Sequence, residues 1–463
     1  MASTYLKRDL SVSETIYKWT WSAWIKRTGL GVAGALFKSR ADSNNWVQAY
    51  FDTSNKLVLQ SYKNGGYHYD FRTVKQFRDT NAWYHFVINV DSSQSTASDR
   101  VRIYVNGEQL SNYTNHSGGT TVNNLTNGDS LIFNTSDSGT GHTIGSWNAG
   151  TYFDGCMSHV HYSSGYSYAP TVFGSTDATT GEWRINTNPT FTLGGNGYTV
   201  LKDGNTITDQ SSNSNDFTVG GGTLTKTEDN PSNVFATLNS LTNWRGQSHT
   251  AAGALNKGSN TTGIGSSEKT LIASTIGVTS GKWYWEAKSD GVSKMFFGIC
   301  NKNAFNDTVA PHDSAGYNGI YYYEAVPDFR ANTGDGSKTT GIASITSGDV
   351  LGFALDMENW ALYIHKNGTY MNSGDPTSGA SKTGAISELF NYGTWYMRYN
   401  EEVFASCYVS STSGSGTASY NFGNGYFGTT AVSSAGTNAS NLGIFEYDVP
   451  AGYTALCTKG LNE

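Results

Sequence analysis

Two clusters in the chain combine aromatic rings with short polar side chains in contexts typical of loops. One runs from Gly145 to Tyr152 and the other from Asp313 to Tyr323. The residues in them that we expect to contact a ligand are Trp147, Asn148, Tyr152, Asp313, Tyr317 and Tyr322. Flat sugar faces stack on Trp and Tyr rings, while Asn, Asp and backbone groups hydrogen-bond the hydroxyls. The clusters therefore predict carbohydrate contact. The competing interpretation is that the tyrosine run belongs to a strand packed in a core.

The acidic residues do not form the pattern that carbohydrate hydrolysis requires. A retaining glycosidase holds two carboxyl groups about 5 Å apart, commonly through an E-x-D-x-x-E run on one strand face, and the chain contains no such run. The nearest groupings are Glu401 with Glu402, interpreted as a solvated pair, and Asp349 with Asp356, interpreted as a strand boundary. Nucleophile-elbow, zinc-protease and P-loop motifs are missing from the sequence as well. We predict that the protein is not an enzyme, and a polysaccharide hydrolase is the least favoured alternative.

Short strands must position these clusters, and one strand pattern occurs twice. An alternating apolar run ends in Asp at Phe86–Asp91, and a second run ends in Asn-Gly at Val101–Gly107. The same order returns at Leu351–Asp356 and Trp360–Gly368. Alternation places every second side chain on one sheet face, and Asn-Gly accepts the positive φ angles of a tight hairpin. The repeat predicts an all-β fold of two antiparallel, jelly-roll-like β-sandwiches.

The distribution of strand and turn signals divides the chain into three parts. Residues 1–174 form the first predicted sandwich, and residues 242–463 form the second, with a C-terminal extension. Between them, residues 175–241 are polar and rich in turns, and include the glycine runs Gly194–Gly197 and Gly220–Gly222. We predict a structured connector here.

Composition excludes several classes of partner. The formal net charge is −7 over 463 residues, so the chain lacks the cationic field that binding to nucleic acid requires. No run of about 18 apolar residues is present, which predicts no membrane insertion. The charged N-terminus does not resemble a secretory signal, so we expect a protein made in a cytoplasm.

Two ordered sets of motifs resemble known domain families. Trp83-Tyr-His85, Ile103–Gly107 and Phe153-Asp-Gly155 resemble the laminin-G, or concanavalin-A-like, sandwich family. The second part resembles the SPRY domain, whose motifs here are Gly281–Glu286, Phe297–Ile299, Gly348–Gly352, Asp356 and Asn421–Gly423. The resemblance implies two consecutive β-sandwich domains of binding type.

The flanking segments narrow this resemblance. The chain is similar to large virion proteins of tailed bacteriophages that couple these two domains, in segments Tyr168–Gly174, Gly181–Trp183, Asp209–Asn213, Asp229–Asn239 and Tyr447–Cys457. Such proteins are tail-fibre, appendage or decoration components. The resemblance therefore implies a place on the virion surface.

The resemblance to laminin-G-like domains implies calcium as a possible ligand, because some of these domains bind calcium through loop carboxylates. Asp154 and His159 are the residues concerned, and Asp91 and Asp99 are further loop carboxylates. An Asp in a Phe-Asp-Gly strand more often accepts hydrogen bonds from neighbouring backbone N–H groups. We predict no cofactor, with calcium as the alternative.

Three hypotheses about function follow. The first is a non-enzymatic virion adhesin whose loops bind a host surface glycan or receptor. The second is a purely structural decoration or assembly protein whose faces bind other virion subunits, and the third is the hydrolase. Single sandwiches bind weakly and repetition raises avidity, so we expect a homo-oligomer.

Overall fold

The protein is described by a computed structural model. The structure describes residues 3–9, 14–133, 141–147, 150–202, 206–239, 244–245, 254–256, 261–264, 270–289, 295–305, 319–323, 328–331, 342–385, 401–409, 416–428 and 430–462. These residues form antiparallel sheets with a few short 3-10 helices, which confirms the predicted all-β class and the β-sandwich organisation. The chain separates into unit 1, Met1–Lys226, and unit 2, Thr227–Glu463.

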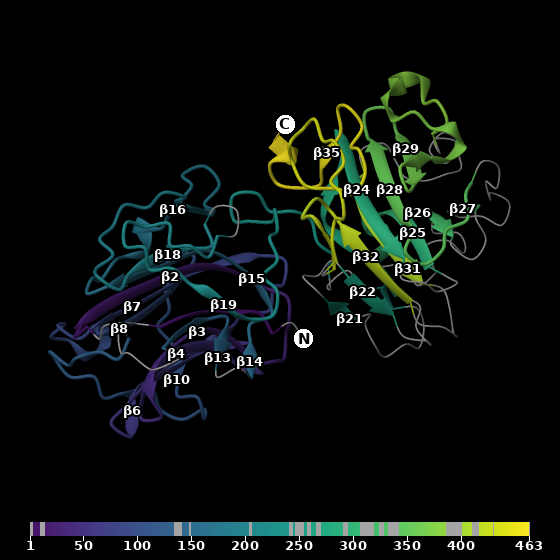
Figure 1. The fold of residues 1–463 in the computed structure, drawn as a ribbon. Coiled ribbons are helices and arrows are strands. Elements are labelled where there is room, and N and C mark those ends of the chain that lie inside the picture. Colours follow the sequence, from purple (N-terminus) through teal and green to yellow (C-terminus); the bar gives the residue numbers. More distant parts are fainter. Residues whose placement is uncertain are drawn as a thin grey trace. The chain divides into compact units, whose positions relative to one another are not determined.

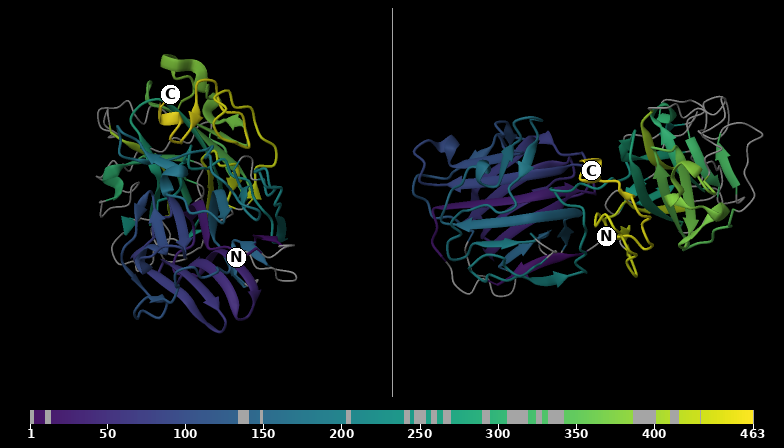
Figure 2. Two further views of the ribbon diagram at one scale, coloured as in Figure 1. Left: turned by 90° about the vertical axis from the view of Figure 1, so that its left-hand side faces the viewer. Right: turned by 90° about the horizontal axis from the view of Figure 1, so that it is seen from above.

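Unit 1 has two main layers, visible in Figure 1 as β2, β7 and β8 on one side and β3, β4 and β6 on the other. The first sheet has the order β18 (Tyr198–Val200), β15 (Gly155–Ser164), β2 (Lys18–Arg27), β7 (Trp83–Asp91), β8 (Val101–Val105) and β9 (Glu108–Gln109). The second sheet has the order β10 (Tyr113–Thr114), β6 (Gly66–Gln76), β5 (Lys56–Lys63), β4 (Asn45–Phe51), β3 (Gly34–Asp42), β12 (His142–Ile144), β1 (Tyr5–Arg8) and β19 (Thr218–Gly221), and β11 (Val122–Asn123) also pairs with β6. Two short hairpins, β13 (Ser146–Trp147) with β14 (Thr151–Tyr152) and β16 (Gly174–Thr176) with β17 (Trp183–Ile185), complete the described strands. The right-hand view of Figure 2 shows these strands, purple to teal, running side by side.

The core of unit 1 lies between its two sheets and follows from alternation. On β2, Trp19, Trp21, Ala23 and Ile25 all enter the same buried cluster. The facing sheet contributes every second residue of β4, namely Val47, Ala49 and Phe51. Across the core, Trp19 and Trp21 contact Phe37 of β3 with ring centroids 6.2 and 4.9 Å apart, so aromatic rings of the two sheets pack together. The intervening residues of each strand must point to the outer faces.

Unit 2 repeats the plan. Its first sheet has the order β20 (Trp244–Arg245), β23 (Thr270–Val278), β31 (Val403–Val409), β25 (Met295–Asn301), β26 (Gly319–Tyr323) and β27 (Asp328–Ala331). The second has the order β21 (Ala254–Asn256), β22 (Thr261–Ile264), β32 (Gly416–Asn421), β24 (Lys282–Ser289), β28 (Val350–Asp356), β29 (Ala361–Lys366) and β30 (Thr369–Tyr370), and β35 (Thr454–Ala455) runs parallel to β24. A short pair, β33 (Tyr426–Phe427) with β34 (Thr430–Ala431), lies beyond β32. The described 3-10 turns are Ala97–Asp99, Pro170–Val172, Lys302–Phe305, Met371–Ser373, Pro376–Ser381 and Gly460–Asn462.

The Asn-Gly turns close the hairpins that the sequence predicts. Asn106 and Gly107 have φ angles of 48° and 81° between β8 and β9, and Asn367 and Gly368 have 48° and 83° between β29 and β30. Two consecutive positive φ angles are the signature of the tight turn that matches the twist of paired strands. The longer hairpins β7–β8 and β28–β29 enclose the polar loops of the repeat.

The predicted connector, residues 175–241, is not a separate part of the structure. Its first portion belongs to unit 1, because β18 pairs with β15 and β19 pairs with β1. Tyr198 and Phe217 are buried in the core of unit 1. The remaining residues, from Thr227 onward, belong to unit 2. The predicted boundary at residue 174 follows from composition, because polar, glycine-rich stretches are typical of linkers. In the structure, strand pairing and the burial of a few apolar residues make part of this stretch belong to the sandwich of unit 1.

A fragment ending at residue 226 is expected to fold cooperatively, whereas one ending at residue 174 is not. The shorter fragment lacks β18 and the rings of Tyr198 and Phe217, and removing a buried aromatic ring costs about 3–5 kcal/mol. Together these losses are comparable with the whole stability of a domain, about 5–15 kcal/mol. Thermal unfolding of both fragments, followed by near-UV circular dichroism, checks this expectation. Equal melting temperatures would contradict it.

Candidate functional site

The two outer faces of unit 1 differ in what covers them. On the sheet that contains β2 and β7, the outward rings of Trp24 and His85 stack at 4.8 Å between centroids. Trp183, from the predicted connector, stacks on His85 at 5.9 Å and donates its indole N–H to His85 Nδ1 at 2.9 Å. Phe173 stacks on His161 in the same layer. This face is therefore occupied by the chain itself, and the outer face of the second sheet is the candidate surface.

A row of four polar side chains crosses that second sheet. Lys38 on β3 lies opposite Gln48 on β4, Gln48 lies opposite Gln60 on β5, and Gln60 lies opposite Asp70 on β6. All four alternate with residues of the core and so point to the outer face. Despite this orientation they are almost completely covered, with exposures of 6% for Lys38, 1% for Gln48, 3% for Gln60 and 1% for Asp70.

The row is joined by hydrogen bonds. Gln48 Nε2 donates to Gln60 Oε1 at 2.9 Å, and Gln60 Nε2 donates to Asp70 Oδ1 at 3.2 Å. Asp70 Oδ2 lies 2.5 Å from Nδ1 of His116, which lies in the loop after β10, and the His116 backbone N–H also donates to this carboxylate. Gln48 Oε1 is buried and has no hydrogen-bond partner among the described residues. Gln48 Oε1 is thus an acceptor of the row that no described donor uses.

Half-buried aromatic rings lie on both sides of the row. Trp46 stacks on Tyr62 with centroids 5.4 Å apart, and Tyr67 contacts Tyr62 edge-on at 5.2 Å. Towards the other edge of the sheet, the ring centroid of Tyr50 lies 5.3 Å from that of Trp147, which belongs to β13. We call the set the outer-face site and define it as Lys38, Trp46, Gln48, Tyr50, Gln60, Tyr62, Asp70 and Trp147.

Lys38 links the two aromatic groups. Its Nζ lies 5.6 Å from the Trp46 ring centroid and 5.4 Å from that of Trp147, distances at which an ammonium group is attracted to a ring face. Burial, followed by the nearby Arg40, lowers the pKa of Lys38 to about 8. The side chain is therefore cationic at neutral pH and loses its charge in mildly alkaline solution. Burial, with the charges of Asp70 and Asp52, raises the pKa of Tyr50 to about 12.

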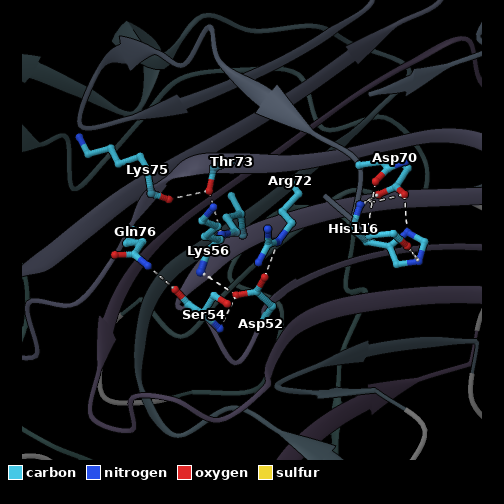
Figure 3. A network of polar contacts seen from close by, with 12 residues as sticks. Asp52, Ser54, Lys56, Asp70, Arg72, Thr73, Lys75, Gln76 and His116 are labelled. Carbon is cyan, nitrogen blue, oxygen red and sulfur yellow. Dashed lines mark hydrogen bonds and ion pairs between the residues drawn. The ribbon is translucent and has the colours of Figure 1, made fainter. Parts of the chain in front are cut away.

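An ion pair on the same sheet fixes the edge of the site. Arg72, the outward neighbour of Asp70 on β6, donates from Nε to Asp52 Oδ2 at 2.5 Å. The other oxygen of Asp52 accepts backbone N–H groups of Ser54 and Lys56 and so closes the turn between β4 and β5. Figure 3 shows Arg72 directed toward Asp52 and Asp70 directed toward His116. These contacts hold the strand ends in register without using Gln48.

The structure brings one predicted ligand residue to this site. Trp147 lies over Lys38 and against Tyr50, as described above. Tyr152 lies across the same hairpin, opposite Ser146, and its ring is 6.0 Å from that of Tyr5. Asn148 lies outside the described residues.

The second predicted cluster does not form a described surface. Tyr322 is fully buried on β26 within the core of unit 2, and its hydroxyl donates to the carbonyl oxygen of Ala343 at 2.8 Å. This placement corrects the prediction of ligand contact at Tyr322, because neither face of its ring is open to a ligand. The physical reason is that Tyr322 lies on the inward face of β26, where its ring packs in the core cluster of unit 2. Asp313 and Tyr317 lie outside the described residues.

Sequence reasoning missed most of the outer-face site. The missed residues are Lys38, Trp46, Gln48, Tyr50, Gln60, Tyr62 and Asp70. A signal was present in Asn45–Phe51, where Trp46, Gln48 and Tyr50 alternate with core residues and give the strand an outward side of aromatic and amide groups. Ligand residues were expected in loops rather than on a strand face.

Two of the carboxylates considered for metal binding have protein partners. Asp154 Oδ1 accepts a hydrogen bond from the Thr28 hydroxyl at 2.9 Å. Asp91 accepts hydrogen bonds from Ser93 and Gln94, and one of its oxygens lies 3.4 Å from Lys18 Nζ. Across the described part of the chain, no three His, Cys, Asp or Glu side chains are grouped so that they could hold a metal ion.

The acidic residues considered for hydrolysis are used in the structure of unit 2. Asp356 is fully buried, accepts hydrogen bonds from the turn at Glu358 and Asn359, and lies 3.2 Å from Lys282 Nζ. Asp349 is paired with Lys366 at 2.8 Å. These contacts agree with their interpretation as strand-boundary residues.

None of the described helices is long and apolar enough to cross a bilayer.

Comparisons with known proteins bear on unit 1. A laminin-G family model, described as the Concanavalin A-like lectin/glucanases superfamily, matches residues 3–173. No curated protein matches the chain in sequence. The description of this family names both lectins and glucanases.

Several solved structures are similar to parts of the chain. They include the SPRY domain of human HERC1 (16% identity, 40% of this chain and 96% of that chain, TM-score 0.28). A heptameric SAP-like pentraxin from Limulus polyphemus has 16% identity over 35% of this chain and 70% of that chain, with a TM-score of 0.25. A Bacteroides ovatus protein, described as a candidate carbohydrate-binding protein, has 17% identity over 48% of this chain and 56% of that chain, with a TM-score of 0.30. TM-scores at this level do not decide a fold, so the architecture rests on the strands themselves. Over residues 3–173 the chain is similar to the concanavalin A-like lectin/glucanase superfamily.

Proposed function

We propose that unit 1 binds a glycan at the outer-face site and that the protein is a non-enzymatic adhesin on the surface of a tailed-phage virion. The observation that carries the first part is the gathering of four half-buried rings, Trp46, Tyr50, Tyr62 and Trp147, on one sheet face beside buried amide, carboxylate and ammonium groups. Aromatic faces with a few fixed polar groups are what sugar recognition uses.

The two kinds of residue have separate roles in this proposal. The half-buried rings offer stacking surfaces for the apolar faces of sugar rings. The hydrogen-bonded row from Gln48 to Asp70 fixes the sheet surface below them, which reduces the ordering that binding would require. Gln48 Oε1 has no hydrogen-bond partner among the described residues, but it is buried. A ligand hydroxyl would therefore reach it only after the side chains that cover it shift.

The virion setting rests on the sequence resemblance alone. Segments across both units are similar to tailed-phage virion proteins, and in that setting the partners are other virion subunits and a glycan or receptor on the host surface. A homo-oligomer would multiply weak single-site binding. A structural decoration protein remains the second candidate, because such a subunit needs only faces that contact its neighbours.

A glycan array tests the central part of this proposal. The intact chain is expected to give a sugar-dependent signal on bacterial surface polysaccharides, and Trp147→Ala should weaken it because a stacking ring is lost. Tyr17→Ala is the matched control, since Tyr17 is an exposed aromatic residue of unit 1 outside the site. A folded wild-type chain without any sugar-dependent signal would favour the decoration protein. Release of oligosaccharide from a bound polysaccharide would instead favour the hydrolase.

A further inference from the structure

A pocket of about 660 Å³ opens in unit 2, and none of its lining residues is one of those predicted to contact a ligand. Its walls come from the end of β29, from β30 and the 3-10 turns after it, and from the C-terminal loops between Ser434 and Pro450. The volume lies within the range of small-molecule sites, about 300–1,000 Å³. All of its lining residues belong to the described part of unit 2.

Three aromatic rings form a box in this pocket. His365 is the floor, and Tyr370 and Tyr447 each meet its ring edge-on, with centroids 5.2 and 5.3 Å away and interplanar angles of 84° and 71°. All three residues line the pocket. We call these three contacting rings the aromatic box. The face of an aromatic ring attracts an organic cation that lies over it.

The floor of the box is held rigidly and is uncharged. His365 Nδ1 accepts the Gly368 backbone N–H at 3.1 Å, and Nε2 lies 2.7 Å from the Tyr284 hydroxyl. This pattern assigns the ring proton to Nε2, so the Tyr284 hydroxyl is free to donate to Glu286 Oε1 at 3.2 Å. Burial lowers the pKa of His365 to about 4, so the imidazole does not repel a cation at neutral pH.

One wall is fixed by the same network. The backbone N–H of Tyr447 donates to Glu286 Oε1 at 2.8 Å, which anchors the loop that carries the ring. Gly368 packs beneath this ring, because a Cβ atom at that position would lie 2.8 Å from Tyr447 and its φ angle is +83°. Any other residue at position 368 would push the ring away. The box therefore depends on the Asn-Gly turn that closes the β29–β30 hairpin.

Three carboxylates give the pocket a negative lining. Asp375, Glu446 and Asp448 all line it, and no Lys or Arg does. Hydrogen bonds from the side chain and backbone of Thr377 lower the pKa of Asp375, and those from the backbone and side chain of Thr437 lower the pKa of Asp448. Both groups therefore stay ionised at neutral pH.

The other wall presents an unused polar atom. The Tyr370 hydroxyl is buried and has no hydrogen-bond partner among the described residues. A buried hydroxyl without a partner is unfavourable, and a hydrogen-bond donor of a ligand that reached it would relieve this cost. This is a second observation, independent of the carboxylates, that points to a bound molecule.

We propose that the pocket binds a small organic cation, an alkylammonium or guanidinium group, against the tyrosine rings that line it and beside the carboxylates of Asp375, Glu446 and Asp448. The aromatic box distinguishes this site from one for a metal ion, which would need converging oxygen ligands. Lysine side chains, arginine side chains and amino sugars all carry such a group. The proposal does not depend on glycan binding by unit 1.

Calorimetric titration of the intact chain tests the proposal. The probes are the N-acetyl methylamides of lysine and arginine, and a glucosamine oligosaccharide. Their neutral counterparts are the norleucine and citrulline derivatives and an N-acetylglucosamine oligosaccharide. At least one cation is expected to bind at least about tenfold more tightly than its neutral counterpart, because a charge-assisted contact is stronger than a neutral one. A factor of ten corresponds to about 1.4 kcal/mol. The probe that binds best identifies the source of the cation.

Variants then assign the binding to the pocket. Asp448→Asn should weaken the best cation about tenfold, and Glu446→Gln should act in the same direction. Tyr370→Phe, which removes only the hydroxyl, should weaken binding by a smaller factor. Glu358→Gln removes the same charge from an exposed position of unit 2 outside the pocket and should leave binding unchanged.

Three results would overturn the proposal. They are the absence of binding by every cation, equal binding of a cation and its neutral counterpart, and equal losses in Asp448→Asn and Glu358→Gln. Trp147→Ala in unit 1 should leave cation binding intact, so failure of the glycan proposal and failure of this one give different results.

Discussion

Replacing Trp46 with alanine is expected to weaken glycan binding by unit 1 about thirtyfold. Trp46 stacks on Tyr62 and covers Lys38, so its removal takes away one stacking surface and loosens another. Central aromatic residues of binding sites typically contribute about 2 kcal/mol or more, and about 1.4 kcal/mol corresponds to a factor of ten in Kd. Calorimetry with the best glycan from the array provides the measurement.

Matched variants separate binding from folding at Trp46. Trp46→Phe keeps a ring on the strand face and should recover a large part of the affinity. Tyr17→Ala removes an exposed aromatic residue elsewhere in unit 1 and should bind as the wild type does. The melting temperature of unit 1 should change little in Trp46→Ala, since the ring lies outside the core cluster. Unchanged affinity in a folded Trp46→Ala chain would exclude the outer-face site as the glycan site.

The second large effect is expected at Glu286, which is fully buried on β24. Its carboxylate accepts hydrogen bonds from the backbone N–H groups of Glu446 and Tyr447, from Asn421 Nδ2 and from the Tyr284 hydroxyl. Glu286→Ala leaves these donors without an acceptor and should destabilise unit 2 by several kcal/mol, since each buried donor left unsatisfied costs about 1–3 kcal/mol. Amide hydrogen exchange of peptides covering residues 282–289 in the intact chain measures the local free energy of opening.

The same residue predicts a pH dependence. Burial raises the pKa of Glu286 to about 7 from its ordinary value of 4.5. Between these values the folded state holds more protons than the unfolded state, so the stability of unit 2 falls as pH rises and the loss is complete above about pH 7. The loss is on the order of 3 kcal/mol, since one pKa unit corresponds to about 1.4 kcal/mol.

Glu286→Gln is the matched control, because it keeps the shape of the side chain and removes its titration. Exchange protection of β24 should fall between pH 5 and pH 8 in the wild type by more than in this variant. Equal slopes in the two proteins would show that Glu286 does not titrate in this range. Because Glu286 also anchors the loop of Tyr447, Glu286→Ala should abolish cation binding in the unit 2 pocket as well.

The hydrogen-bond network around Glu286 joins two of the motifs that resemble the SPRY domain. Glu286 from the Gly281–Glu286 motif and Asn421 from the Asn421–Gly423 motif meet at 3.1 Å, although 135 residues separate them in the chain. Asn421 Oδ1 also accepts the backbone N–H groups of Gly423 and Gly425. The two motifs are thus parts of one buried polar cluster that ties the C-terminal loops to the sheet.

The sequence alone determined the fold class, because period-two alternation and Asn-Gly turns are local properties of the chain. It predicted the hairpins at Asn106 and Asn367 and the structural use of Asp349 and Asp356. It also placed Trp147 in a candidate ligand cluster, and the structure shows what that ring contacts. These inferences needed only residues near one another in sequence.

Only the tertiary structure decided which strand faces are open and which are covered. Tyr322 and Trp46 are both aromatic residues on strands, but β26 lies inside a sheet whose inward face packs in the core, whereas Trp46 points away from it. The row from Lys38 to Asp70 comes from four strands, and its members meet only through strand register. The covering of the other sheet by Trp183 and Phe173 likewise depends on where a polar, turn-rich stretch returns to the domain. Local sequence fixes the period of each strand, but pairing over long sequence separations fixes its neighbours, and the neighbours determine whether a ring becomes core or binding surface.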